Sequence, residues 1–240
     1  IYTGEDTLSL HDALPIYGGF TIAAGLETAI SYIERFHFDE GDIKYLKSLR
    51  DLEGNPYFDD AYLNYLSELK LKVSIDAVPE GTVVFPFEPL LRVEGPLIAC
   101  QLLETPLLNL INFPTLIATK AARLRIAAGD DSIMEFGLRR AQGIDGAITA
   151  ARSAYIGGCD STSNLLAGKL YGIPVRGTHA HSWVMVFDEE EEAFKAYAET
   201  LPGNTIFLVD TYDTIQGVHK ACEVGKYLKN NRSEEHTSEL

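Results

Sequence analysis

The sequence predicts an α/β protein in which a small mixed α+β region is followed by repeated strand–helix units. Between residues 71 and 94, apolar residues alternate with polar ones, as in strands that have one face in water. The stretches on either side have apolar residues three and four positions apart, which is typical of amphipathic helices. From residue 131 onward, short strand-like runs alternate with helical runs, and this alternation favours a parallel sheet or barrel.

The first half of the chain divides into helical, β and again helical segments. Helices are expected at 21–36, 42–49 and 59–69, and strands at 71–75, 82–87 and 90–94. The pattern beyond Pro96 is helical, and we expect Pro106 and Pro114 to divide it, since proline breaks the helical hydrogen-bond ladder. The three resulting helices are 97–105, 106–112 and 114–128. The third has a basic side that suits either solvent or a phosphate, formed by Lys120, Arg123 and Arg125.

The second half is expected to consist of strand–helix units. Strands are expected at 132–136, 173–187 and 205–209, and helices at 147–155, 162–170, 189–199 and 215–228. Polar residues interrupt the strand IPVRGTHAHSWVMVF at 173–187, and functional groups in such folds gather at the carboxyl ends of strands. His181 in this segment is the first candidate for acid, base or nucleophilic chemistry, because imidazole titrates near neutral pH.

The two ends of the chain resemble translated sequencing-adapter DNA. TLSLHDALPI at 7–16 and RSEEHTSEL at 232–240 correspond to such DNA read in frame, so we expect residues 1–17 and 232–240 to be artefacts without packing contacts. The natural segment is then expected to hold two parts. These are a mixed helical and β domain at 18–130 and the first strand–helix units of an α/β barrel at 131–231. On this interpretation the chain stops before the barrel can close.

Composition bears on the partners and the compartment. The formal net charge is −15, which makes the chain a poor nucleic-acid binder but does not oppose a local basic pocket for a phosphorylated small molecule. The three cysteines, Cys100, Cys159 and Cys222, have neither disulfide nor zinc spacing and suit a reducing compartment. No apolar run approaches the ~20 residues of a membrane helix. We therefore expect a cytoplasmic protein with neither a nucleic-acid nor a membrane partner.

Polar clusters lie at the ends of predicted strands and turns. In the first cluster, the adjacent Arg139 and Arg140 could hold a carboxylate or a phosphate with their planar guanidinium groups. In the last, the carboxylates of Asp210 and Asp213 suit a metal, a hydroxyl or a charged imidazole. A glycine-rich turn before a helix also offers backbone N–H groups to an anion. Together, four clusters predict a rim that binds an anionic substrate: 135–143, 157–161, 177–182 and 210–213.

The His-x-His pair offers a different interpretation. On a strand, His179 and His181 would face the same way and could ligate one metal, as in hydrolases built on barrels. Such sites need further histidine and acidic ligands. The natural segment has two other histidines, His37 in the early helical region and His219 on the last predicted helix. The sequence therefore favours a site for an anionic substrate over a metal centre.

Several longer segments resemble the nicotinate phosphoribosyltransferase family. They are FGLRRAQGIDG at 136–146, GGCDSTSNLLAGKLYGIPVRGTHAHSW at 157–183 and VDTYDT at 209–214, with GGFTIAAGLETAISYI at 18–33 and LLETPLLNLINF at 102–113 matching its N-terminal part. The resemblance implies a small mixed domain and an irregular, TIM-like α/β barrel of the type II phosphoribosyltransferase fold, truncated in this chain, within a homodimer. It implies ATP-coupled transfer of a phosphoribosyl group from 5-phosphoribosyl-1-pyrophosphate to nicotinate, which forms nicotinate mononucleotide for NAD biosynthesis. Mg²⁺ is expected to accompany the phosphorylated substrates.

The resemblance also implies roles for individual residues. His181 matches the phosphorylated histidine of an Ala-His-Ser signature, and Thr178 matches a threonine that contacts nicotinate. Phe136 matches the aromatic residue stacked on the pyridine ring, and Arg139 matches the arginine near its acid group. Two matched acids, one facing the ring and one beside the ribose and pyrophosphate, are Asp160 and Asp210. Further candidates for the site are Arg140, Ser161, Ser182, His179 and Asp213.

Two alternatives stay open at this point. A nicotinamide-using relative shares much of the pattern, but the Gly-Thr-x-Ala-His-Ser form at 177–182 and the short spacing from Arg139 to Asp160 favour nicotinate. The other alternative is a non-catalytic ligand-binding α/β domain, which a phosphorylated histidine would argue against. The family's ring-covering tyrosine would lie before Gly18, and its ribose and 5′-phosphate clamps would lie beyond Asn231. We therefore expect the chain by itself to be inactive.

Overall fold

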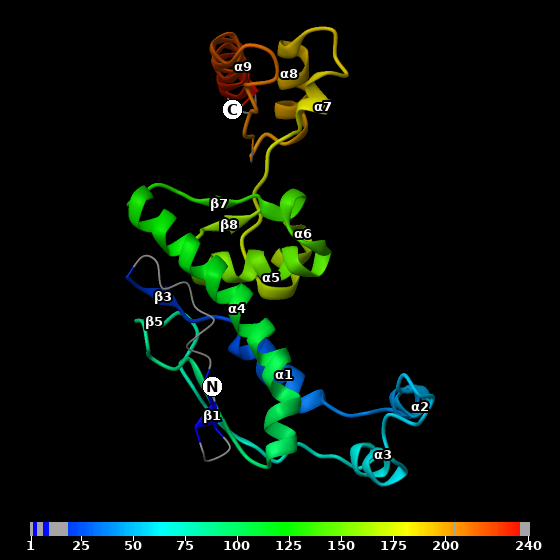
Figure 1. Ribbon diagram of the computed structural model, residues 1–240. Helices are drawn as coiled ribbons and strands as arrows, with labels where there is room; N and C mark the ends of the chain where they lie inside the picture. The colour runs from blue at the N-terminus through cyan, green and yellow to red at the C-terminus, as the bar shows by residue number, and fades with distance from the viewer. Residues whose placement is uncertain (1, 4–6, 10–18, 204, 236–240) are drawn as a thin grey trace. The chain divides into compact units, whose positions relative to one another are not determined.

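The structure is a computed structural model that describes residues 2–3, 7–9, 19–203 and 205–235, which form a mixed α/β arrangement (Figure 1). The chain divides into two compact units, Ile1–Ile173 and Pro174–Leu240. This division follows compactness alone, so the domain boundary expected between residues 130 and 131 stays a prediction. Among the described helices, none combines the length and the apolar composition that crossing a membrane requires.

An antiparallel sheet lies in the first unit. Residues 7–9 form a strand of this sheet and pair with residues 92–94. The expectation of an N-terminal segment without packing contacts is therefore wrong for residues 7–9. Val93 lies in the third strand and is fully buried, with Leu8 opposite it on one side and Ile75 on the other. The strand order is β1 (Tyr2–Thr3), β2 (Thr7–Ser9), β6 (Leu91–Glu94) and β4 (Ser74–Ala77).

The main core of the first unit lies between this sheet and two helices, α1 (Leu26–Arg35) and α4 (Leu97–Ala128). Leu91 of the sheet and Leu103 and Leu107 of α4 are fully buried in it. The two α4 leucines are four residues apart, so they lie on one face of the helix. This face of α4 is the one that packs in the core of the first unit.

The predicted helix at 21–36 begins only at Leu26. Thr21–Ile22 instead form β3, which pairs antiparallel with β5 (Val83–Val84). The backbone hydrogen bonds of these residues therefore go to a neighbouring strand rather than along a helix.

Two buried threonines of α4 bind the backbone that begins at β3. The hydroxyl oxygen of Thr119 accepts the N–H of Ile22 at 2.9 Å. The hydroxyl of Thr115 accepts the N–H of Ala24 at 3.2 Å and donates to the carbonyl oxygen of Ala24 at 3.1 Å. Both threonines are fully buried, so these bonds satisfy backbone groups that water does not reach. The β3–α1 connection is thereby fixed along α4.

The helix α4 runs without interruption through Pro106 and Pro114, so the predicted division into three helices is wrong. Pro114 has no N–H to donate to the carbonyl of Leu110, four residues earlier. The backbone of Gly25, with φ 98°, packs against that carbonyl, and a Cβ at Gly25 would lie 2.1 Å from its oxygen. Tertiary packing along α4 outweighs the local cost of the two prolines, because most helix stability in proteins comes from packing.

An ion pair between Glu80 and Arg152 ties the turn before β5 to α5 (Gly143–Ile156). Arg152 donates to both carboxylate oxygens of Glu80, at 2.9 and 2.6 Å, and also pairs with Glu27 of α1. Glu80 further accepts the N–H of Gly25 at 2.5 Å. Burial disfavours the charge of Glu80, but the hydrogen bonds from Arg152 and Gly25 outweigh it and lower the pKa of the carboxyl.

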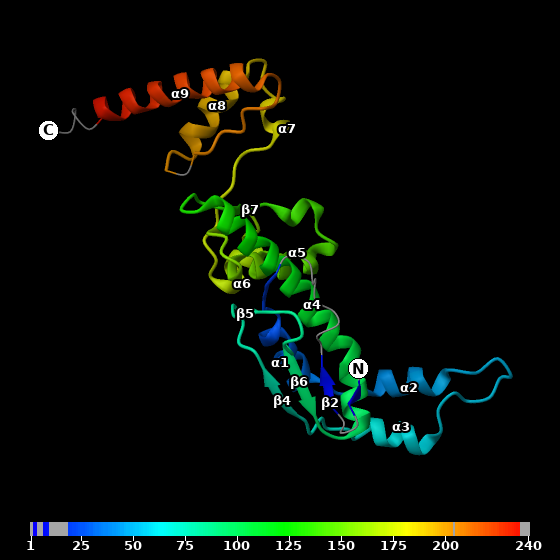
Figure 2. The same ribbon diagram turned by 60° about the vertical axis from the view of Figure 1, so that its left-hand side comes forward.

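The helices α2 (Glu40–Ser48) and α3 (Asp60–Ser67) lie side by side (Figure 2). Each begins after an aspartate, Asp39 or Asp59, whose side chain accepts a backbone N–H three residues later, at 2.8 and 2.7 Å. Both helices confirm the predictions made from apolar spacing, with shifts at their ends.

A parallel strand pair follows α4. β7 (Met134–Glu135) and β8 (Ser161–Thr162) pair with Met134 opposite Ser161, and α5 connects them. The helix α6 (Leu165–Tyr171) follows β8. β7 and α5 confirm the strand and the helix predicted at the start of the alternation, whereas β8 was not predicted, because a helix was expected to begin at Thr162. β7 and β8 form the one parallel pair among the described residues, which contain no closed barrel.

The second unit is helical where the structure describes it. The predicted strands at 173–187 and 205–209 are wrong, because the described residues there form a short helix, turns and irregular backbone. The helices of this unit are α7 (His181–Val184), α8 (Glu190–Thr200) and α9 (Thr214–Glu235). The helix α9 continues through residues 232–235, and the expectation that the C-terminal segment makes no packing contacts stays a prediction.

The run around α7 was interpreted as a strand because its residues are aromatic and β-branched. The rings of Trp183 and Phe187, four residues apart, lie with their centroids 5.0 Å from each other. Val184 is fully buried against Ala193 and Phe194 of α8. A spacing of four residues brings side chains together on a helical turn, and this packing prevails over β propensity.

Candidate functional site

His181 is the first residue of α7, and its imidazole lies beside Asp210 and Thr211. Nδ1 of His181 is 3.2 Å from the hydroxyl oxygen of Thr211, and Nε2 is 3.8 Å from Oδ1 of Asp210. The side chains of His181 and Asp210 are 46% and 55% exposed, so a small substrate can reach them. An imidazole with one nitrogen in a hydrogen bond keeps the other for proton transfer or nucleophilic attack.

His179 is buried, unlike His181. Its Nε2 accepts the backbone N–H of Leu208 at 3.1 Å, and its ring contacts the ring of Tyr197 at a centroid distance of 4.9 Å. Burial lowers the pKa of His179. The two histidines do not share a face, because residue 181 already belongs to a helix. Among the described residues, no three histidine, cysteine or acidic side chains come together as a metal site.

The other predicted residues of the second unit have separate places. Thr178 donates its hydroxyl to the carbonyl oxygen of Ile206 at 2.7 Å. Asp213 precedes α9, and its side chain accepts the N–H of Gln216 at 2.8 Å, as expected of an N-cap aspartate. Ser182 is exposed in α7. Asp213 therefore has a structural role that its sequence position alone did not indicate.

In the first unit, Glu135 organises the turn that carries the predicted arginines. Its carboxylate accepts the hydroxyl of Thr162 at 2.6 Å and also the N–H of Gly137. Gly137 is the first residue of the 3₁₀ helix η2 (Gly137–Arg140). Glu135 thus couples the end of β7 to β8 and fixes the start of η2.

Phe136, Arg139 and Arg140 lie on this turn and are exposed. Within the part of the chain that the structure describes, neither guanidinium has an ion-pair or hydrogen-bond partner. An exposed ring beside two uncompensated cations suits a planar, anionic ligand. The structure brings these three predicted residues together.

Asp160 is held by groups of its own unit. Its Oδ2 accepts the N–H of Ile133 at 2.7 Å and a guanidinium N–H of Arg125 at 2.5 Å. The hydrogen bond from Ile133 and then the one from Arg125 lower the pKa of the Asp160 carboxyl. Arg125 also donates to the carbonyl oxygens of Gly158 at 2.9 Å and Asp131 at 2.7 Å. Arg125 therefore binds within the protein and does not offer the phosphate contact considered for this helix.

The predicted site residues are distributed over both compact units. Phe136, Arg139, Arg140, Asp160 and Ser161 belong to the first, whereas Thr178, His179, His181, Ser182, Asp210 and Asp213 belong to the second. Ser161 is buried, and its hydroxyl has no partner among the described residues. Sequence reasoning missed Thr211 as a partner of His181. Its position between two predicted acids, in VDTYDT, was a signal that could have identified it.

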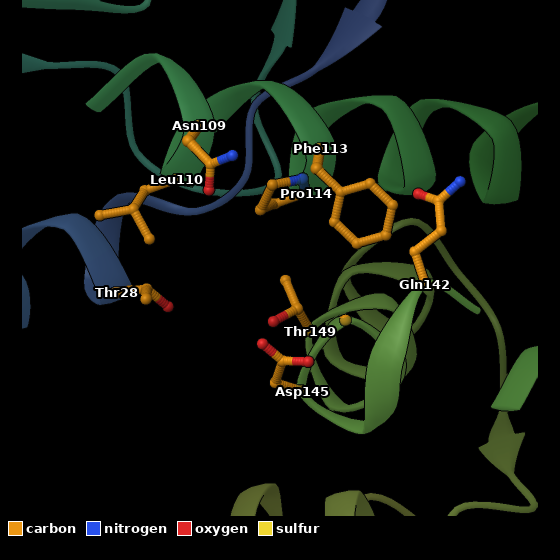
Figure 3. Close-up of a pocket in the computed structure, with 9 residues that line it drawn as sticks. Thr28, Asn109, Leu110, Phe113, Pro114, Gln142, Asp145 and Thr149 are labelled. Carbon is orange, nitrogen blue, oxygen red and sulfur yellow. The ribbon is translucent and has the colours of Figure 1, made fainter. Parts of the chain in front are cut away.

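A pocket of about 360 Å³ in the first unit lies apart from all of these residues. Side chains of α1, α4, α5 and the residue before α5 surround it (Figure 3). Asp145 is the one charged side chain among its lining residues, which are Thr28, Asn109, Leu110, Phe113, Pro114, Gln142, Asp145, Gly146 and Thr149. The pocket contains none of the predicted site residues.

Known proteins similar to this chain include nicotinate phosphoribosyltransferases. Residues 13–112 match the family model described as the nicotinate phosphoribosyltransferase (NAPRTase) N-terminal domain. Nicotinate phosphoribosyltransferase of Bacillus subtilis is 48% identical over 214 residues, covering 89% of this chain and 42% of that protein. The crystal structure of human nicotinic acid phosphoribosyltransferase matches with a TM-score of 0.77 and 36% identity, over 89% of this chain and 52% of that chain.

A third match is the crystal structure of nicotinate-nucleotide pyrophosphorylase from Pyrococcus furiosus, with a TM-score of 0.66 and 27% identity over 91% of this chain and 47% of that chain. These neighbours place the fold in the type II phosphoribosyltransferase class. Within that class, the chain is a homologue of the nicotinate phosphoribosyltransferases, which confirms the resemblance seen in the sequence. It spans less than half the length of the first curated relatives it matches.

Proposed function

We propose that this chain supplies the nicotinate-binding and phosphohistidine part of an ATP-coupled nicotinate phosphoribosyltransferase. Such an enzyme transfers a phosphoribosyl group from 5-phosphoribosyl-1-pyrophosphate to nicotinate and forms nicotinate mononucleotide, a step of NAD biosynthesis. The observation that carries the proposal is the contact of His181 with Thr211 and Asp210. Homology to nicotinate phosphoribosyltransferases supports the choice of reaction.

In this proposal, His181 accepts the terminal phosphoryl group of ATP. In the tautomer that donates Nδ1–H to the Thr211 hydroxyl, Nε2 carries the lone pair, which attacks phosphorus while the bond to the departing ADP oxygen breaks. The ring gains positive charge as this happens, and the carboxylate of Asp210, 3.8 Å from Nε2, stabilises that charge. The phosphorylated ring then carries roughly two negative charges. Mg²⁺ bound to the phosphates would offset the repulsion from Asp210, since carboxylate and phosphate oxygens are its preferred ligands.

The nicotinate contacts are proposed residue by residue, from the pattern of the family. The ring of Phe136 would stack on the pyridine, and the guanidinium of Arg139 would pair with the nicotinate carboxylate. Thr178 would offer its hydroxyl oxygen, and Asp160, kept ionised by its partners, would face the ring. Three residues are secondary candidates for substrate contacts: Arg140, Ser161 and Ser182.

We propose further that residues 131–231 are the first units of an irregular, TIM-like barrel, after a mixed domain at 18–130. The partial coverage of the relatives supports a barrel that other residues complete. A homodimer and a cytoplasmic location are part of the same proposal. Positioning of substrates can supply ~7–11 kcal/mol of a barrier, so the chain without those other residues should turn over poorly.

Two measurements test the proposal. The first follows acid-labile ³²P from [γ-³²P]ATP in the 240-residue chain, in His181→Ala and in His219→Ala, which changes another exposed histidine of the same unit. The second assays nicotinate mononucleotide in a chimera in which residues 18–231 replace the matching segment of the Bacillus subtilis relative. Label and ATP-stimulated turnover should persist in His219→Ala and disappear in His181→Ala. Label that persists in His181→Ala, or a chimera that prefers nicotinamide, would contradict the proposal.

A further inference from the structure

We infer that His179 is a positioning residue, which holds His181 in register with the segment that carries Asp210 and Thr211. The inference rests on the proposed function of His181. Its evidence, however, is the geometry of a residue that has no role in that proposal.

The two segments are joined by side chains, since neither forms a strand in the described part of the chain. His179 lies two residues before His181, and its ring accepts the N–H of Leu208, which lies two residues before Asp210. One hydrogen bond therefore links equivalent positions on the two segments. A second hydrogen bond runs from the Thr178 hydroxyl to the Ile206 carbonyl. It joins residues 28 positions apart, against 29 positions for the bond between His179 and Leu208.

The ring of His179 has a fixed orientation because aromatic side chains surround it. Its centroid lies 5.7 Å from that of Phe194, 4.9 Å from that of Tyr197 and 6.4 Å from that of Phe207. Only 8% of the residue is exposed. Since Nε2 accepts a hydrogen bond, the ring proton is on Nδ1 and the imidazole is neutral. A packed, neutral ring can thus serve as a rigid acceptor for one particular N–H.

The consequence for His181 is geometric. Consecutive Cα atoms are about 3.8 Å apart, so a slip of one residue between the two segments would move side chains by a comparable distance. Such a slip would separate His181 from both Thr211 and Asp210, because those contacts are 3.2 and 3.8 Å long. The state of the His181 ring should therefore report whether the His179 bond is present.

The test compares two substitutions of similar size. His179→Gln keeps an acceptor for the Leu208 N–H, whereas His179→Met removes it. Phe207→Leu is the packing control, because it alters the aromatic surroundings and leaves the hydrogen bond intact. In each 240-residue variant, ¹⁵N chemical shifts of the His181 ring report its tautomer, and thermal unfolding reports stability. A second readout is the rate at which phosphoramidate phosphorylates His181, with ammonia leaving as the nitrogen–phosphorus bond forms.

We expect His179→Met to shift the His181 ring nitrogens to the averaged values of a free imidazole and to slow phosphorylation at least fivefold. His179→Gln should retain most of both wild-type properties, and Phe207→Leu should lower Tm without changing the His181 shifts. The inference is overturned if His179→Met leaves the His181 shifts unchanged, or if Phe207→Leu alters them equally. If His179→Met does not fold, loss of the wild-type shifts in folded His179→Gln would overturn it.

The two proposals fail in different ways. If His181 is never labelled by ATP but its ring shifts follow His179, the positioning inference stands and the proposed function is wrong. If His181 is labelled but its shifts ignore His179, the reverse holds.

Discussion

The hydroxyl oxygen of Thr211 lies 3.2 Å from Nδ1 of His181, a residue thirty positions earlier in the chain. This contact distinguishes the two ring nitrogens, since Nε2 has no hydrogen-bond partner as near among the described residues. A neutral imidazole that donates from Nδ1 has its lone pair on Nε2. When Nδ1 donates to the Thr211 hydroxyl, Nε2 is the nitrogen that remains available for chemistry.

Replacing Thr211 with valine should weaken the preference for Nε2 as the reactive nitrogen of His181. A hydrogen bond of this kind contributes about 1 kcal/mol net, so phosphorylation of His181 should fall roughly fivefold in Thr211→Val, since 1.4 kcal/mol corresponds to a factor of ten. Thr211→Ser retains the hydroxyl and should remain near wild type. The measurement is the initial rate of acid-labile phosphate formation, and equal rates in the two variants would argue against a role for the hydroxyl.

Replacing Gly25 with alanine should destabilise the first unit strongly. The residue has φ 98°, and its new Cβ would meet the Leu110 oxygen at 2.1 Å. The combined strain and overpacking should cost about 3 kcal/mol or more in free energy of unfolding. Gly54 is a matched control, with φ 88° and no atom within 4 Å of its Cβ position, so Gly54→Ala should cost about 1 kcal/mol. Urea unfolding, monitored by hydrogen exchange of the first unit, measures the free energy of unfolding of both variants. Similar losses in Gly25→Ala and Gly54→Ala would contradict the packing argument.

Replacing Glu80 with glutamine should give a pH-dependent loss of stability. The pKa of Glu80 is lowered from its ordinary value of 4.5 in the folded protein, so the unfolded chain binds the proton first as pH falls. The stabilisation is therefore fully present above pH 4.5 and is lost as pH falls below it through the folded pKa. At pH 7, breaking this largely buried pair with Arg152 should cost about 3 kcal/mol.

The control for Glu80 is Asp60, which pairs with Lys47 at the surface, where the two side chains are 76% and 64% exposed. Asp60→Asn should cost less than about 1 kcal/mol at pH 7. Thermal unfolding of both variants from pH 3 to pH 8 measures the difference. A Glu80→Gln penalty that stays constant across this range would show that the charge is not the cause.

Replacing Gly217 with alanine should disturb the segment that carries Asp210. A Cβ at Gly217, in the first turn of α9, would lie 2.1 Å from the carbonyl oxygen of Val209. The expected cost is about 1–3 kcal/mol, with the His181 ring shifts changed as well. Gly225 lies in the same helix with no atom within 4 Å of its Cβ position, so Gly225→Ala should stabilise by up to about 1 kcal/mol. Fluorescence of Trp183, the one tryptophan of the chain, follows unfolding of this unit, and equal effects would contradict the argument.

Periodicity predicted the elements whose partners are local. The helices α2, α3 and α8 follow from apolar spacing, because a helix satisfies its own backbone hydrogen bonds. The strands at 173–187 and 205–209 were predicted wrongly, because a strand needs a neighbour, and strand propensity does not show whether one is present. In the structure, Thr178 and His179 join these segments with side-chain hydrogen bonds instead.

The prediction for Pro106 and Pro114 failed for a related reason. Local rules give the cost of a proline in a helix, but they do not include the packing that offsets it. Gly25 and Leu110 are far apart in sequence, so their close approach was invisible to pattern reasoning. The pairing of His181 with Thr211 is equally non-local. The resemblance to relatives named both His181 and Asp210, which lie 3.8 Å apart in the structure.

The buried hydroxyls of Thr115 and Thr119 have a consequence for where this protein can be divided. The family match ends at residue 112, before either threonine. A polypeptide ending there would leave the N–H groups of Ile22 and Ala24 without their acceptors, and each such buried group costs about 1–3 kcal/mol. A piece of the first unit that keeps both acceptors therefore has to extend at least through Thr119, beyond the end of the family match.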